Sequence, residues 1–220
     1  MEKKGQSSCF IIGGGPSLIG FDFSKLKDKD TITINKSIFD TPNPNYFITV
    51  DYTFLSKIGK RRDLFKSIVT TKVFVADFHF SYLQEKDGRI VDVRNNLIYK
   101  LNDFDIIIKA RSAQGIGYTY NDFRTGLNTG YCALQLAIIL GYKKIYLLGM
   151  DLNRKEITHY HGGYGERFDK FNSRIPTYLI KFRKGLDQLK HDDKGIEVIS
   201  CSPVSQLNKN IPYQDIDRIL

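Results

Sequence analysis

The sequence predicts a three-layer α/β domain in which helices flank a mostly parallel β-sheet. Seven short runs rich in β-branched and aromatic residues recur along the chain, and helical patterns separate several of them. The runs are apolar enough to be covered on both faces, which is typical of buried parallel strands. The predicted strands are Ser8–Ile12, Thr31–Asn35, Tyr46–Val50, Lys72–Ala76, Phe104–Ala110, Lys144–Leu148 and Ile196–Cys201.

Three segments have the pattern of helices. Tyr52–Ile68 is amphipathic and predicts one helix. Thr129–Gly141 is apolar apart from Gln135, so it predicts a buried helix that ends at its last glycine. Asn172–Lys190 carries a regular apolar stripe, and Pro176 is expected in its first turns, where proline is tolerated.

Length and composition predict one folded domain. The chain has 220 residues, of which 41% are hydrophobic and 26% charged, which is ordinary for a globular protein. We expect residues 1–220 to form a single nucleotide-binding domain with a lid or acceptor-site insertion around 152–172. No apolar run approaches the ~20 residues that span a bilayer, and the first residues lack a signal-peptide pattern, so a cytoplasmic protein is expected.

The three cysteines are expected to be free thiols. Cys9, Cys132 and Cys201 are odd in number and widely spaced, which favours buried free thiols over disulfides or zinc ligands.

The net charge favours an anionic ligand or partner. Lys and Arg outnumber Asp and Glu by 33 to 24, and the net charge of +9 is typical of proteins that bind nucleotides, phosphorylated sugars or nucleic acid. The basic clusters within 57–66 and 167–190 can also be simply solvated helix faces.

Candidate site residues follow from the rule that open parallel sheets bind ligands beyond the carboxyl ends of their strands. Each candidate lies at or just after the end of a predicted strand. They are Gly13, Gly14, Gly15, Ser17, Asn35, Asp51, Asp77, Gly149 and Asp151.

The first of these segments, Gly13–Leu18 (GGGPSL), is a glycine-rich loop. Glycines let the backbone approach a phosphate or ribose closely, and successive N–H groups form an anion-binding concavity. Ser17 adds a hydroxyl group, or caps a following turn. The loop matches neither the G-x-G-x-x-G nor the G-x-x-x-x-G-K-[ST] pattern, so a nucleotide site of another kind is expected, with an ordinary glycine turn as the alternative.

Three polar residues at other strand ends have side chains suited to a nucleotide. Asn35 offers a donor and an acceptor for a ribose or base edge. Asp51 is a carboxylate for ribose hydroxyls or a divalent ion, and Asp151 is a second acidic candidate, also for catalysis. Turn formation and helix capping are the alternatives. Because the two carboxylates lie far apart in sequence, no metal site is predicted.

Asn128, Thr129 and Gly130 precede the predicted apolar helix. A helix N-terminus is positively polarised and suits a phosphate, which makes these small residues candidates for nucleotide binding. Helix capping by Asn128 or Thr129 explains them equally well.

Two of the four histidines lie in the segment 158–165 (THYHGGYG). Glycine gives this segment mobility, and His159 or His161 can act as a general base near neutral pH, so we expect a lid or acceptor-site segment. A zinc site is disfavoured because no cysteine or third histidine lies nearby. His79 and His191 have no such setting and are expected to be ordinary surface or packing residues.

Several segments resemble two related families. The loop GGGPSL, the segment FDFSKLKDKDTITINKSIF and the segment NTGYCALQLAIILGYKKIYLLGMDLN resemble the bacterial sialyltransferases of glycosyltransferase family 42. They also resemble the MptE-like family, which contains 6-hydroxymethyl-dihydropterin pyrophosphokinases, and PNPNYFITVD is similar to a pattern of that group. The resemblance covers roughly Cys9 to Asp151 and resumes at Ile196–Leu207, which looks like the terminal segment of the sialyltransferases.

The sialyltransferase resemblance implies a GT-A-like, Rossmann-like fold with a CMP-sugar site. It implies that Gly14, Gly15 and Ser17 face the nucleotide phosphate, and that Asn35 and Thr129 lie near the donor. His161, or else His159, would deprotonate the acceptor hydroxyl. The chain departs from that family where Gly14 and Asp51 replace asparagines and where Leu152-Asn153 replaces a tyrosine position.

The leading hypothesis is therefore a glycosyltransferase that uses a CMP- or UDP-sugar and needs no metal cofactor. Its acceptor is a glycan or modified DNA such as a hydroxymethylated pyrimidine, the latter favoured by the basic clusters alone. One alternative is an MptE-like pyrophosphokinase that transfers diphosphate from ATP with Mg²⁺, held by acidic residues. Another is a nucleotide-binding module without catalysis. A homo-oligomer is left open.

Overall fold

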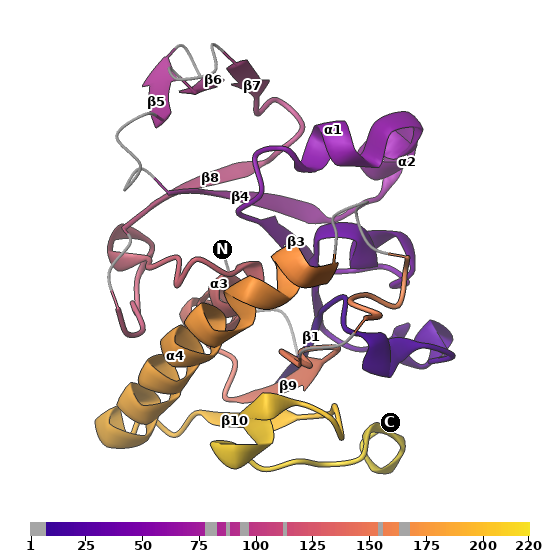
Figure 1. Cartoon of the computed structure of the whole chain (residues 1–220), viewed down its shortest axis with the longest axis vertical. Helices are drawn as coiled ribbons and strands as arrows, with labels where there is room; N and C mark the ends of the chain where they lie inside the picture. The colour runs from indigo at the N-terminus through magenta and orange to yellow at the C-terminus, as the bar shows by residue number, and fades with distance from the viewer. Residues whose placement is uncertain are drawn as a thin grey trace.

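The computed structural model describes residues 8–77, 83–86, 89–92, 97–111, 114–153, 156–162 and 168–220 (Figure 1). Seven strands form one sheet in the order β10-β9-β1-β2-β3-β4-β8, and every pairing in it is parallel. Its strands are β1 (Ser8–Ile12), β2 (Thr31–Ile34), β3 (Tyr46–Thr49), β4 (Thr71–Asp77), β8 (Ile106–Ala110), β9 (Lys144–Leu148) and β10 (Glu197–Ser200). The predicted parallel α/β sheet is confirmed.

The helices of the described part differ widely in length. The α-helices are α1 (Phe54–Ile58), α2 (Arg62–Ser67), α3 (Thr129–Ile139) and α4 (Phe168–Asp192). Short 3₁₀ helices fill most other connections. They are η1 (Pro16–Leu18), η2 (Phe23–Leu26), η3 (Asn35–Phe39), η4 (Gly59–Arg61), η5 (Tyr120–Asp122), η6 (Gln206–Lys209) and η7 (Ile216–Arg218).

The strand order contains a switch point between β1 and β9. From β1 the chain adds strands on one side, through β2, β3 and β4 to β8, and then returns to the other side of β1 with β9 and β10. Because parallel crossovers are right-handed, the two directions place their connections on opposite faces of the sheet. A crevice opens beyond the carboxyl ends of the strands at such a point, and ligands bind there.

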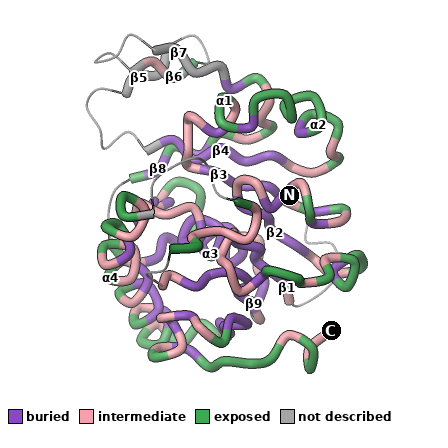
Figure 2. Tube along the Cα trace, turned by 45° about the vertical axis from the view of Figure 1, so that its right-hand side comes forward, coloured by how far each residue is buried: buried purple, intermediate pink, exposed green. Residues whose placement is uncertain are grey.

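The two faces of the sheet bury different sets of side chains. Cys9 and Ile11 of β1 pack with α3 and with Phe182 of α4 in the largest core cluster. Phe10 and Ile12, which alternate with them, face η1, η2 and the C-terminal segment. Farther along this second face, Phe47 packs against α1 and α2. Figure 2 shows the buried residues concentrated along the central strands. The three predicted layers are present, although one is built mainly from short helices.

The predicted helix over Tyr52–Ile68 is interrupted. Gly59 has a φ of 50°, so the segment divides into α1, the 3₁₀ turn η4 and α2. Such a φ strains an L-residue but not glycine, which is why the interruption falls at this position. Each short helix still buries a phenylalanine, Phe54 in α1 and Phe65 in α2.

The long helix α4 begins earlier than predicted. Pro176 was expected in the first turns, but it lies inside a helix that starts at Phe168. A proline inside a helix removes one backbone hydrogen bond, so the turns before it need other contacts. The ring of Phe171 supplies one, because it meets the His159 ring edge-on at 4.9 Å.

A second, antiparallel sheet with the order β5-β6-β7 is inserted between β4 and β8. Its strands are β5 (Leu83–Lys86), β6 (Arg89–Asp92) and β7 (Leu97–Lys100), and it was not predicted.

The three cysteines, Cys9, Cys132 and Cys201, are buried free thiols, as predicted. Among the described helices, none is long and apolar enough to cross a membrane.

The polar residue of α3, Gln135, is fully buried and joins the helix to the chain before it. Its Oε1 accepts from the N–H of Gly117 at 2.9 Å and of Arg124 at 3.1 Å, and its Nε2 donates to the Arg124 carbonyl. Buried N–H groups need an acceptor, which explains a glutamine in an otherwise apolar helix.

We expect Gln135→Leu to lower the free energy of unfolding by about 2–4 kcal/mol, because the buried N–H of Gly117 and the part-buried N–H of Arg124 lose their acceptor. Urea denaturation monitored by circular dichroism measures this loss. The neighbouring volume-conserving change Leu136→Met is the control and should cost less than about 1.5 kcal/mol. Equal losses in both variants would contradict this role of Gln135.

Candidate active site

The glycine loop after β1 lies against the loop after β9, at the switch point of the sheet. The N–H of Gly13 donates to the Leu148 carbonyl and that of Gly15 to the Gly149 carbonyl, both at 2.8 Å. A Cβ atom on Gly13 would lie 2.5 Å from the Gly149 oxygen, and one on Gly15 would lie 2.6 Å from it. No side chain fits in this contact, which explains these two glycines by close backbone approach.

The carboxylate of Asp151 holds this loop in place. Asp151 is only 4% exposed, and its two oxygens accept from the Ser17 N–H at 2.8 Å and from the Ser17 hydroxyl at 2.6 Å. Its backbone carbonyl accepts from the N–H of Gln206, so the C-terminal segment is tied to the same point. Hydrogen bonds to an ionised acceptor are among the stronger ones, so Asp151 acts as a positioning residue.

The sequence predicted that successive N–H groups of this loop would be available to bind an anion, but the structure shows otherwise. The N–H groups of Gly13, Gly15 and Ser17 all donate to protein acceptors. A phosphate therefore cannot use these three groups as long as the loop keeps this conformation. Gly14 is the loop residue that faces the histidines.

The histidine segment packs over Gly14. The N–H of Tyr160 donates to the Gly14 carbonyl at 3.0 Å. A Cβ atom on Gly14 would lie 2.9 Å from Cδ2 of His159 and 3.1 Å from Nε2 of His161. The two imidazole rings are stacked with centroids 5.0 Å apart, and the Tyr160 hydroxyl donates to Asp40 at 2.9 Å. The segment thus bridges the glycine loop and the end of η3.

Both imidazoles are held in the neutral form. Burial is the main cause that lowers the pKa of His159 to about 4, with further contributions from His161 and Lys36. The pKa of His161 is also lowered to about 4, by burial and then by the charges of Lys36 and Arg61, while Asp40 acts in the opposite direction. A neutral imidazole can accept a proton at pH 7, as a general base must.

The second group of candidates lies at the carboxyl ends of β2 and β3. Asn35 has a φ of 52°, so β2 ends at Ile34 rather than at Asn35. The Thr49 hydroxyl donates to Asn35 Oδ1 at 2.7 Å and accepts from the Asp51 N–H at 3.0 Å. Asp51 in turn forms an ion pair of 2.6 Å with Lys57.

This second group is joined to the first through η3. The Ser37 hydroxyl donates to the carbonyl of Ile12, the last residue of β1, at 2.7 Å. Asn35 and Asp51 therefore stand at the same edge of the sheet as Gly13.

The start of α3 reaches the same edge from one face of the sheet. Asn128 caps the helix, because its Oδ1 accepts from the Tyr131 N–H at 3.1 Å. A Cβ atom on Gly130 would lie 2.6 Å from Cε of Met150, the residue before Asp151. Thr129, between them, is the first residue of the helix. The capping alternative thus applies to Asn128, and close packing explains Gly130.

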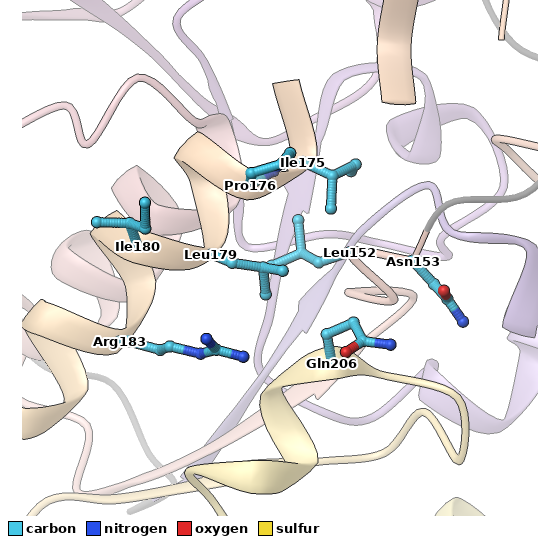
Figure 3. Close-up of a pocket in the computed structure, with 8 residues that line it drawn as sticks. All are labelled: Leu152, Asn153, Ile175, Pro176, Leu179, Ile180, Arg183 and Gln206. Carbon is cyan, nitrogen blue, oxygen red and sulfur yellow. The ribbon is translucent and has the colours of Figure 1, made fainter. Parts of the chain in front are cut away.

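A hollow of about 380 Å³ adjoins the loop after β9 (Figure 3). Leu152 and Asn153 form one side, and α4 forms another with Leu179 and Arg183, among others. In the close-up, the side chains of Leu152 and Leu179 lie next to each other, and those of Arg183 and Gln206 flank them. The hollow begins at the residue after Asp151, where the expected lid or acceptor-site insertion around 152–172 starts, but its lining by α4 and Gln206 was not predicted.

Some residues named in the sequence analysis lie outside the described residues. Gly163, Tyr164 and Gly165 of the histidine segment and His79 are not described, and for Asp77 only its place in β4 is. His191, expected to be an ordinary surface or packing residue, is highly exposed near the end of α4. Within the described part of the chain, no three His, Cys, Asp or Glu side chains gather as metal ligands would. Of the expected insertion around 152–172, residues 168–172 belong to α4.

Sequence reasoning missed two cations at this site, Lys36 and Arg61. Lys36 directly follows Asn35, and its charge acts on both histidines. Arg61 was placed in a basic cluster with a solvated helix face as the alternative. Neither has a sequence signal of its own, because the fold alone brings η3, η4 and the histidine segment together.

Comparison with known proteins places the fold. No family model matches the chain. A probable 3-deoxy-manno-octulosonic acid transferase of Salmonella typhimurium is 24% identical over 266 residues, which cover 98% of this chain and 94% of that protein. The structure of the sialyltransferase CstII from Campylobacter jejuni, in complex with the substrate analogue CMP-3FNeuAc, superposes with a TM-score of 0.55 at 15% identity, over 94% of this chain and 86% of that one.

The MAf glycosyltransferase from Magnetospirillum magneticum superposes with a TM-score of 0.53 at 14% identity, over 95% of this chain. The chain spans 33% of the length of that protein. This chain has the fold of these glycosyltransferases. The predicted likeness to the sialyltransferases is confirmed for the fold, whereas the likeness to pterin pyrophosphokinases stays a prediction.

We expect Gly15→Ala to lower the free energy of unfolding by about 1–3 kcal/mol, because the added methyl group meets the Gly149 carbonyl and the Asp151 carboxyl carbon at 2.6 Å. Gly14→Ala is the matched control. Its methyl group meets only histidine side-chain atoms, which can move, so the loss should be clearly smaller. Equal unfolding midpoints in urea for the two variants would show that the contact does not constrain the loop.

We expect His159 and His161 to titrate at about pH 4 in the ligand-free protein, well below the ordinary value near 6.5. The imidazole proton resonances, followed by NMR over pH 3.5–8, measure both values, and His159→Asn and His161→Asn assign them. Titration of either ring near pH 6.5 would mean that the segment does not pack over Gly14 as described.

Proposed function

We propose that this chain is a glycosyltransferase that takes a sugar from a nucleotide-activated donor bound beyond the carboxyl ends of β1 and β9. The observation that carries the proposal is the pair His159 and His161, half-buried, neutral and stacked over Gly14 at the switch point of the sheet. Group transfer to a hydroxyl needs a base at the reacting oxygen, and this is where the fold leaves one.

The donor we propose is a CMP-activated acidic sugar. The Salmonella relative is named for the transfer of 3-deoxy-manno-octulosonic acid, and the Campylobacter enzyme is a sialyltransferase seen with CMP-3FNeuAc. Both sugars are 3-deoxy-2-keto acids, so each bears a carboxylate on its anomeric carbon. The Campylobacter complex therefore favours CMP over UDP, and the two comparisons together favour a sugar of this class over a neutral one.

The acceptor we propose is a hydroxyl group of a glycan. The Campylobacter sialyltransferase has been solved with a trisaccharide acceptor and CMP. No described contact favours DNA over a glycan, so modified DNA is kept as an outcome of the acceptor test below.

The residues suit a direct displacement that inverts the anomeric centre. His161 accepts the proton of the acceptor hydroxyl while the oxygen of that hydroxyl bonds to the anomeric carbon of the sugar. The bond from that carbon to the phosphate oxygen breaks, and the phosphate leaves with the electron pair. His159 positions His161 by stacking, and Asp151 positions the glycine loop through Ser17.

The remaining candidates are proposed to bind the nucleotide. Asn35 and Asp51, held in one hydrogen-bonded chain through Thr49, face the ribose or base. Thr129 contributes a hydroxyl at the N-terminus of α3, which stabilises a phosphate. This mechanism needs no metal ion, whereas the pyrophosphokinase alternative requires Mg²⁺ and ATP.

Calorimetric titration with CMP, UDP, GDP and ATP, each with and without Mg²⁺, tests the nucleotide. We expect CMP to bind most tightly and Mg²⁺ to leave its Kd unchanged. Tight binding of ATP that requires Mg²⁺ would contradict the proposal and favour the pyrophosphokinase. Activity assays with CMP-sugars, using glycans and hydroxymethylated DNA as acceptors, complete the test. If CMP binds but no CMP-sugar is hydrolysed or transferred to either acceptor, the result would favour the non-catalytic module.

We expect His161→Ala to lower kcat for transfer or hydrolysis of the CMP-sugar by about 10²–10⁴-fold, because the acceptor oxygen loses its base. The Kd for CMP should stay within about threefold. His191→Ala removes the highly exposed histidine of α4 and serves as the control, with unchanged rates. Equal rates in the wild type and in His161→Ala would remove the assigned base.

A further inference from the structure

The 3₁₀ helix η3 brings two cations to the edge of the site. Lys36 and Phe39 are three residues apart, and residues with this spacing lie on the same side of a 3₁₀ helix. The guanidinium group of Arg61 stacks on the Phe39 ring, 3.7 Å from its centroid. Lys36 and Arg61 are therefore held on one side of η3, although they come from different segments of the chain.

The same end of η3 is tied to the histidine segment. Asp40, the residue after η3, accepts from the Tyr160 hydroxyl at 2.9 Å, and His161 follows Tyr160. The Tyr160 N–H is bonded to Gly14. Lys36 and Arg61 thus lie beside the histidine pair and the glycine loop, not on a separate basic surface.

The charges of this group repel one another. Burial is the main cause that lowers the pKa of Lys36, and the neighbouring charges of Arg61 and Lys57 lower it further. The charges of Lys36 and Arg61 also lower the pKa of His161. Like charges held together against their repulsion are typical of a site that receives an anion.

The acidic groups nearby have other contacts. Asp51 forms its ion pair with Lys57 at 2.6 Å and accepts from the Thr53 hydroxyl at the same distance. Asp40 accepts from Tyr160. The Arg61 guanidinium lies against an aromatic ring. The group keeps a net positive charge.

We propose that Lys36 and Arg61 form an anion subsite beside His161 that binds an acidic group of the donor, either its phosphate or the carboxylate of its sugar. The subsite itself stands on the geometry of η3, and its assignment to the donor rests on the proposed function. A bound anion would also offset the part of the lowering of the His161 pKa that the charges of Lys36 and Arg61 cause, while the larger part, which burial causes, would remain. The base would then be stronger with the donor bound than without it.

Three probes test the subsite by calorimetry: inorganic pyrophosphate, CMP and CMP-sialic acid. Lys36→Met and Arg61→Gln remove one charge each, and Lys36→Arg keeps the charge. Lys27→Met is the matched control, because Lys27 is exposed and precedes β2, at the other end of this strand from Lys36. Far-ultraviolet circular dichroism confirms that each variant is folded.

We expect Lys36→Met and Arg61→Gln each to weaken pyrophosphate binding by about tenfold, the size of one hydrogen bond to a charged group. Lys36→Arg and Lys27→Met should stay within about threefold of the wild type. A tenfold loss for CMP assigns the subsite to the phosphate. A loss for CMP-sialic acid with CMP unchanged assigns it to the sugar carboxylate.

A second readout separates this role from a merely structural one. In the wild type, pyrophosphate should raise the NMR-determined pKa of His161, which is faced by His159, Lys36, Arg61 and Asp40. The rise should be smaller in Lys36→Met.

The outcomes distinguish the two proposals. No pyrophosphate binding by the wild type, or equal binding by the wild type and Lys36→Met, overturns the subsite and leaves the glycosyltransferase proposal standing. Pyrophosphate binding that depends on Lys36, without binding of any cytidine nucleotide, keeps the anion subsite and overturns its assignment to a CMP-sugar donor.

Discussion

The site depends on the part-buried hydrogen bonds between the Asp151 carboxylate and Ser17. They fasten the loop after β1 to the loop after β9, which are neighbours in the sheet although 134 residues separate Ser17 from Asp151 in sequence. The glycines on both sides allow the two backbones to approach, and the C-terminal segment bonds to the carbonyl of the same aspartate. A buried carboxylate is costly unless it is fully bonded, so this contact fixes the shape of the loop. The loop in turn supports the histidine pair.

Electrostatics underlie the proposal that the site binds an anionic ligand. Burial and neighbouring cations keep both imidazoles neutral, and Lys36 itself is disfavoured as a cation by burial, Arg61 and Lys57. A donor that brings negative charge would stabilise the cations and strengthen the base together. A neutral ligand would not stabilise the charged forms of Lys36 and His161 in this way. The proposed base and the proposed acidic sugar are therefore connected through the charge of the donor.

The sequence predicted the sheet and the edge where the candidates meet, because buried parallel strands and strand-end residues leave clear local patterns. Asn35, Asp51, Gly13 and Asp151 were found in this way. It did not predict the partners of these residues, since the Ser17–Asp151 bond and the approach of His161 to Gly14 join distant segments. The break at Gly59 and the early start of α4 were not predicted for a related reason, because local periodicity was not the deciding factor. At Gly59 the backbone conformation interrupts the helix. At the start of α4, Phe171 packs against His159. The inserted antiparallel sheet had one usable signal, the turn dipeptide Asp87-Gly88.

The most direct test of the central claim is a crystal structure of the chain with CMP. The account predicts the nucleotide at the carboxyl edge of the sheet, beside the histidine pair that covers Gly14, with its phosphate within reach of His161 and its nucleoside near Asn35 and Thr129. CMP bound elsewhere, for example in the hollow between Leu152 and α4, with no contact to His161, Asn35 or Thr129, would contradict it.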